Sequence, residues 1–205
     1  MLVATHLQCT RGLRTLFSDL DFTVGPGELV HVAGANGSGK TSLIRILCGL
    51  LEPTAGTVRW DGADIRELAE DYRGRLVYIG HAQGVKDELT PAENLRIACT
   101  FAGLDVDAPA LAGALARLGL ERAAHVPVKS LSQGQRRRAA LARLELSSER
   151  SLWLLDEPFI ALDAEAAARV AHLIGEHLGR GGMVVMTTHQ PLPAFGSAMR
   201  SIELA

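Results

Sequence analysis

The sequence predicts an α/β fold with a mainly parallel central sheet and a small antiparallel β layer beside it. Three short runs are almost continuously apolar, as is typical of buried parallel strands: Leu29–Ala33, Leu152–Leu155 and Met183–Met186. Longer segments of helical periodicity separate them, and this alternation favours parallel strands joined by helices. The start of the chain holds two β-like runs, 2–10 and 20–24, which predict the antiparallel layer.

The remaining elements follow from apolar periodicity and from turn residues. Further strands are predicted at 57–60 and 75–79, and helices at 42–50, 91–102, 108–118, 164–178 and directly after Leu131. Because residues 82–127 contain helical patterns but no apolar strand, we expect a helical subdomain of about 82–150 inserted in the core. We expect one domain over residues 1–205, with Met183–Met186 as its last buried strand.

The composition argues against several classes of protein. Of the 205 residues, 47% are hydrophobic and 21% are charged, and the net charge is -2, so nothing indicates a general attraction to nucleic acid or to anionic lipid. The cysteines Cys9, Cys48 and Cys99 lie far apart, which favours buried free thiols over a disulfide or a zinc site. No apolar run reaches the ~18 residues that span a bilayer, so we expect a chain that does not span a membrane by itself.

A glycine-rich loop follows the strand at Leu29–Ala33 and precedes a helix. It fits the pattern G-x-x-x-x-G-K-[ST], in which glycines allow successive backbone N–H groups to point at one anion. We expect Lys40 to contact the β- and γ-phosphates of a nucleotide and Thr41 to bind Mg²⁺. A chance glycine-rich turn is the alternative. The predicted nucleotide-binding residues of this loop are Gly34, Ala35, Asn36, Gly37, Ser38, Gly39, Lys40, Thr41 and Ser42.

Two carboxylates follow the apolar strand Leu152–Leu155. Ligands of open α/β sheets bind outside the carboxyl ends of the strands, so both side chains are expected at the nucleotide. Asp156 is predicted to bind the metal, and Glu157 is predicted to act as the catalytic base that orients the attacking water. The alternative is a pair of acids that only cap a helix.

Leu131-Ser132-Gln133-Gly134-Gln135 precedes the long helix, and Ser132 is a good N-cap residue. This stretch resembles the signature of the ABC family, with Gln133 at a position that is usually glycine. The loop, the signature, the acidic pair, Ala161-Leu162-Asp163 and Thr187-Thr188-His189 follow one another in the order of that family. The resemblance covers nearly the whole chain and implies a P-loop NTPase fold of ABC type.

The resemblance also implies roles for individual residues. Two such domains would pair head to tail, so that Ser132, Gly134 and Gln135 of one domain cap the ATP bound by the other. His189 would act as the catalytic switch residue at the γ-phosphate, the alternative being an exposed loop histidine. The family's metal-sensing glutamine is expected at the position of Ala82, and Gln83 comes one residue later. Arg11 stands in the region where the family carries an aromatic residue, and its guanidinium could stack on adenine.

Two segments, 80–90 and 187–192, resemble a narrower group, the ATP-binding subunits of the bacterial haem exporter of cytochrome c maturation. That resemblance implies an ATPase that drives haem export through transmembrane subunits. It would work as a homodimer, peripheral on the cytoplasmic face of the inner membrane. The alternatives are a soluble non-transport ABC ATPase, a subunit of an importer or exporter for another substrate, and a nucleotide sensor without turnover. The basic run Arg136–Arg138 is interpreted as a solvated helix face rather than a nucleic-acid patch.

Overall fold

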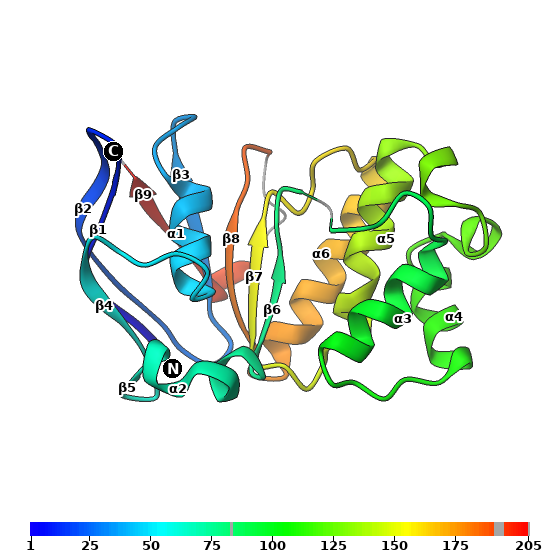
Figure 1. The fold of residues 1–205 in the computed structure, drawn as a ribbon, viewed down its shortest axis with the longest axis horizontal. Helices are drawn as coiled ribbons and strands as arrows, with labels where there is room; N and C mark the ends of the chain where they lie inside the picture. Colours follow the sequence, from blue (N-terminus) through cyan, green and yellow to red (C-terminus); the bar gives the residue numbers. More distant parts are fainter. Residues whose placement is uncertain (83, 191–194, 205) are drawn as a thin grey trace.

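A computed structural model describes residues 1–82, 84–190 and 195–204 (Figure 1). Its central sheet is parallel throughout, which confirms the predicted fold class, and has the strand order β6-β7-β8-β3-β9. The bounds of these strands are β6 Leu76–Ile79, β7 Leu152–Asp156, β8 Met183–Thr187, β3 Leu29–Gly34 and β9 Met199–Leu204. After β8, which matches the predicted last buried strand, the chain adds the partly buried edge strand β9, which pairs with β3 and was not predicted.

The second sheet is antiparallel, as predicted, with the order β2-β1-β4-β5. Its strands are β1 Leu2–Arg11, β2 Arg14–Val24, β4 Ala55–Trp60 and β5 Ala63–Asp64. Strand β2 therefore begins well before the predicted run at 20–24. Its first residues pair with β1 across a tight turn, which brings Arg11 opposite Arg14 at the tip of the hairpin.

Helix α1 (Lys40–Leu47) lies between the two sheets (Figure 1). Its apolar side chains Leu43, Ile44 and Leu47 are fully buried in a core that also draws on both sheets. Helix α2 (Ile65–Arg73) closes this core with Ile65 and Tyr72. The burial of these side chains fixes the direction in which α1 starts.

The other helices cover the opposite side of the parallel sheet (Figure 1). They are α3 Pro91–Phe101, α4 Ala108–Arg117, α5 Gln133–Glu145 and α6 Ala164–Gly179. A second apolar core joins them to strands β6, β7 and β8. Helices α3, α4 and α5 fall within residues 82–150, where the helical insertion was expected. None of the helices in the described ranges is long and apolar enough to cross a bilayer.

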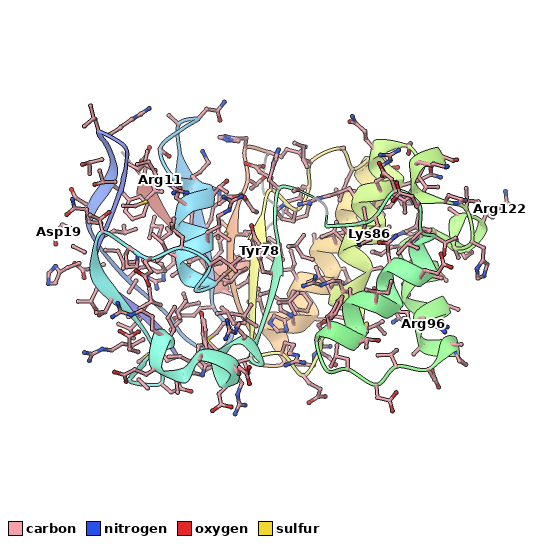
Figure 2. All side chains as sticks on the ribbon, in the orientation of Figure 1. Arg11, Asp19, Tyr78, Lys86, Arg96 and Arg122 are labelled. Carbon is pink, nitrogen blue, oxygen red and sulfur yellow. The ribbon has the colours of Figure 1, made fainter. Side chains whose placement is uncertain are left out.

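Three arginines, two on α5 and one in the loop before β7, donate to carbonyls in β6 and on either side of it. Arg143 donates through Nη2 to the carbonyl of Tyr78 over 3.0 Å, and Tyr78 is labelled near the middle of the molecule in Figure 2. Arg137 donates to the Gly80 carbonyl over 3.0 Å, and Arg150 donates to the Gly74 carbonyl. Carbonyl groups that would otherwise stand open at the sheet edge are thereby paired.

The prediction that Arg136–Arg138 forms a solvated helix face was wrong for the central residue, Arg137. Arg136 pairs with Asp87 at 3.2 Å. Arg138 donates to the carbonyls of Leu118 and Gly119. Arg137, in contrast, is 0% exposed, because helical periodicity turns it toward the sheet, whereas Arg136 and Arg138 are half-buried.

Candidate functional site

The carboxyl ends of β3, β6, β7 and β8 meet at one edge of the parallel sheet, at the top of Figure 1. The loop between β3 and α1 is the predicted phosphate loop. Gly34 has a φ of +143°, and a Cβ at this residue would lie 2.6 Å from both the Leu204 carbonyl and Ser38 Oγ. Gly39 has a φ of +104°, and a Cβ there would meet Leu16 at 2.9 Å. Only glycine fits these positions, so the strand turns sharply into α1.

The start of α1 is open to an anion. Gly39 occupies its N-cap position, and no side chain accepts a hydrogen bond from the first amides within the described residues. The first turn also carries no acidic residue. A helix start with free N–H groups and a positive dipole end attracts phosphate.

The loop also contains two buried polar side chains, Lys40 and Ser38. Lys40 is 8% exposed, and its ammonium donates to the Gly34 and Ala35 carbonyls at 2.7 and 2.9 Å. Ser38 Oγ is buried without a hydrogen-bond partner among the described residues. A buried hydroxyl normally finds a partner, so this oxygen is an unpaired polar group within the loop.

Asp156 connects the acidic strand to the phosphate loop. Its side chain is 1% exposed at the end of β7, and Oδ2 accepts a hydrogen bond from Thr41 Oγ1 over 2.8 Å. Oδ1 accepts a second bond from the buried Thr187 Oγ1 over 2.7 Å. The hydroxyl of Thr41 and the carboxylate of Asp156 thus offer two hard oxygen ligands side by side, which is the donor type that Mg²⁺ prefers.

Glu157 adopts a left-handed backbone conformation, with a φ of +53°. This conformation costs a non-glycine residue roughly 1–2 kcal/mol and persists only where neighbouring groups hold it. Its N–H donates to Oγ1 and to the carbonyl of Thr187. The backbone N–H of His189 donates to Glu157 Oε2 over 3.3 Å, and His189 Nε2 lies 3.5 Å from Oε1. The two predicted catalytic residues are therefore neighbours.

A cavity of about 640 Å³ joins the phosphate loop to the acidic pair. Many predicted site residues line it: Arg11, Asn36, Gly37, Gly39, Lys40, Thr41, Ser42, Asp156, Glu157 and His189. Sequence reasoning did not single out Leu16, His81, Ile160 and Gln190, which line it too. Three of them could have been found from their position in the sequence, because His81, Ile160 and Gln190 follow strands that end at the same sheet edge. Gly34, Ala35 and Ser38 form the base of the loop and do not line the cavity.

Arg11 and Gln83 were the two predicted site residues outside the main motifs. Arg11 lies at the tip of the β1–β2 hairpin, at one side of the cavity (Figure 2). Leu16, on β2, lines the same cavity. Gln83 lies outside the described residues.

The signature residues are not brought to this cavity. Ser132 caps α5 in a capping box: Ser132 Oγ accepts from the Gln135 N–H, and Gln135 Oε1 accepts from the Ser132 N–H over 2.9 Å. The predicted N-cap is thus present. A Cβ on Gly134 would lie 2.8 Å from the Ala161 carbonyl, so the start of α5 packs directly against the loop after the acidic pair.

Comparison with known proteins agrees with this geometry. The family model for ABC transporters matches residues 17–160. The cytochrome c biogenesis ATP-binding export protein of Nitrosomonas europaea is 53% identical over 192 residues, which cover 94% of this chain and 90% of that protein. The protein of the same name from Dechloromonas aromatica is 48% identical over 204 residues, which cover 100% of this chain and 100% of that protein.

Solved structures show the same fold. A dimeric ATP-binding cassette in a post-hydrolysis state, bound to ADP and Pi, matches 100% of this chain and 94% of its own with a TM-score of 0.85 at 25% identity. An ATP-binding subunit of an ABC transporter has a TM-score of 0.81 at 28% identity, over 92% of this chain and 79% of its own. The chain therefore belongs to the ABC transporter family of ATPases, as a member of its group of cytochrome c biogenesis ATP-binding export proteins.

Proposed function

We propose that the cavity binds ATP and that Glu157 orients and deprotonates the water that attacks the γ-phosphate. One observation carries this proposal: Thr41 of the phosphate loop donates to Asp156 over 2.8 Å, and Glu157, the next residue, lines the same cavity. A carboxylate that lines the cavity together with the phosphate loop can reach a water beside the terminal phosphate. His189, in contact with the Glu157 carboxylate, would hold the base and sense the γ-phosphate.

The loop itself would bind the phosphates. Its backbone amides and the start of α1 donate hydrogen bonds to the phosphate oxygens, and Lys40 supplies a positive charge. Because Lys40 now donates to two carbonyls of the loop, ATP would exchange these bonds for stronger charge-assisted ones. Arg11 and Leu16 would contact the base.

Thr41 and Asp156 would hold Mg²⁺, to which their adjacent oxygens are suited. When bound, the metal ion neutralises the charge of the phosphate oxygens during transfer. Thr187 would keep the Asp156 carboxylate aimed at this position through its 2.7 Å hydrogen bond. Gln83 is the third ligand proposed from the sequence.

The position of the signature supports pairing between two copies. Ser132, Gly134 and Gln135 stand at the start of α5, away from the cavity of their own chain, so they would cap ATP bound by a second copy. In this arrangement the α5 start stabilises the charge on the γ-phosphate. The dimeric cassette whose fold matches supports the same arrangement.

A membrane partner would convert this cycle into export. The relatives are named for export in cytochrome c biogenesis, which supports a role in delivering haem for these proteins across the inner membrane. We propose a peripheral position on the cytoplasmic face, with a transmembrane subunit docked near residues 82–103. Helix α3 exposes Phe101 (88%) and Ile97 (38%) there, which suits an apolar contact.

The substitution Glu157→Gln tests the role of the base. It keeps the shape of the side chain, so ATP should bind with unchanged affinity while steady-state turnover falls by about a hundredfold or more. Gel filtration with ATP should show a stable dimer of the variant, because the bound nucleotide is no longer consumed.

Glu70→Gln is the matched control, since Glu70 is an exposed acid on α2. It should leave turnover unchanged. Hydrolysis by Glu157→Gln at the parental rate would refute the assignment of the base. Co-purification from detergent-solubilised membranes tests the partner, and recovery of a membrane subunit with the tagged chain is the expected result.

A further inference from the structure

Arg137 is a buried cation directly behind the acidic pair. Its guanidinium donates to four backbone carbonyls: through Nη2 to Glu157 at 2.7 Å and Asp156 at 2.9 Å, through Nη1 to Gly80 at 3.0 Å, and through Nε to Pro158 at 3.4 Å. All four acceptors belong to the main chain. The cation therefore fixes the paths of two loops rather than the position of one side chain.

The turn at Glu157 needs such support. Its left-handed backbone places the carboxylate toward the cavity, and this direction would be lost if the residue relaxed to an extended or helical conformation. Thr187 holds the N–H of Glu157, and Arg137 holds the carbonyl. Both peptide groups of this residue are thus anchored, one to β8 and the other to α5.

Arg137 also links this turn to two other parts of the site. It lies on α5, little more than one turn after the signature residue Ser132. Its bond to Gly80 reaches the loop after β6, whose next residue, His81, lines the cavity. One guanidinium therefore connects the signature helix, the β6 loop and the turn that carries Glu157.

We propose that Arg137 is a positioning residue for ATP hydrolysis, which holds the Glu157 carboxylate in its productive direction and couples it to the signature helix. This inference rests on the proposed role of Glu157 as the base. Arg137 itself does not line the cavity, and all the hydrogen bonds that it makes to described residues go to the main chain behind the site. It should affect the rate of the chemical step and not the affinity for ATP.

The test compares Arg137→Gln, Arg137→Lys and Arg138→Gln in the full chain. Arg138 is a matched control, because it also donates from α5 to two backbone carbonyls, but at Leu118 and Gly119, away from the cavity. For each protein we would measure the thermal midpoint of unfolding. The turnover number, the KM for ATP and the affinity for a fluorescent ATP analogue are then measured at a temperature well below that midpoint.

We expect Arg137→Gln to lower kcat by about tenfold or more with KM within about twofold of the parent. Arg137→Lys should recover part of this loss, since an ammonium keeps the charge but cannot reach all four carbonyls. Arg138→Gln should keep kcat within about twofold of the parent even where its thermal midpoint falls.

Equal kcat in Arg137→Gln and the parent would overturn the inference, as would equal losses in the two glutamine variants. If Arg137→Gln does not fold, the folded lysine variant decides: full kcat overturns the inference, and reduced kcat at unchanged KM supports it. Glu157→Gln is measured alongside. If Glu157→Gln turns over at the parental rate, the proposed role of Glu157 as the base is refuted. If Glu157→Gln is inactive while Arg137→Gln keeps the parental kcat, only the positioning role of Arg137 is refuted.

Discussion

Acidification should destabilise this fold through one buried histidine. His177 on α6 is 1% exposed, and its ring stacks on Trp153 with 3.9 Å between ring centres and 4° between the planes. Burial lowers the pKa of His177 to about 4; the nearby Arg180 adds to this, and a hydrogen bond with the Met183 backbone partly opposes it. A Cβ on Gly182 would overlap the ring, so the imidazole is closely enclosed.

The sign and size of the effect follow from the two pKa values. In the unfolded chain the pKa of His177 is near 6.5, so between this value and about 4 the unfolded state binds more protons than the folded state. Stability is therefore lost as the pH falls through this window. The difference between pH 7 and pH 5 amounts to about 2 kcal/mol, with a limit of ~3 kcal/mol below the folded pKa.

Urea unfolding followed by circular dichroism at pH 7 and pH 5 measures this loss in the parent and in His177→Leu. The leucine variant should lose about 2 kcal/mol less than the parent between the two pH values, whatever its stability at pH 7. The pKa of the exposed His6 is raised by Asp19 and Asp21, so protonation of His6 favours the folded state as the pH falls. This contribution is the same in the parent and in the leucine variant. Equal losses in the two proteins would refute a buried neutral imidazole.

Lys40→Ala should abolish binding of a fluorescent ATP analogue, because the charge at the base of the loop is lost; unchanged affinity would contradict the phosphate site. Thr187→Val keeps the shape of the side chain but leaves Asp156 Oδ1 and the Glu157 N–H without this partner, so urea unfolding should show a loss of ~1–3 kcal/mol, and unchanged stability would argue against these bonds. Arg11→Ala should raise KM for ATP by about two- to fivefold with little change in kcat, and an unaltered KM would exclude contact with the base.

Elements with strong local signals were predicted to within a few residues. Helix α3 begins at Pro91, as expected, after the capping residue Thr90, which forms a capping box with Glu93. Strand β7 lies at the predicted apolar run because a continuously buried strand tolerates no polar interruption. In such segments, local preference and tertiary burial favour the same structure.

Helix α2 and strand β9 were missed for different physical reasons. Helix α2 is short and mostly polar, contains a non-helical residue at Ala69, and buries only Ile65 and Tyr72. Strand β9 is only partly buried at the edge of the sheet, and it forms because β3, which is distant in sequence, offers a parallel partner. Neither the polar pattern of the first nor the non-local pairing of the second is visible in a short window of sequence.

The sequence predicted which motifs would meet at the cavity, because the carboxyl ends of parallel strands share one edge. It did not predict how they are held there. The burial of Arg137 was not predicted, because this residue is part of a basic run whose composition is typical of a solvated helix face. His81 was likewise passed over, because its place at the cavity depends on where β6 ends in the sheet.

The arginines along β6 also bear on how copies of this protein can associate. An open strand at the border of a sheet is a template for unwanted growth into multi-chain assemblies. Here guanidinium groups already occupy the carbonyl of Tyr78 within β6 and those of Gly74 and Gly80 on either side of the strand. A strand that approached this edge would have to displace the Arg143 guanidinium from the Tyr78 carbonyl, which disfavours strand addition there.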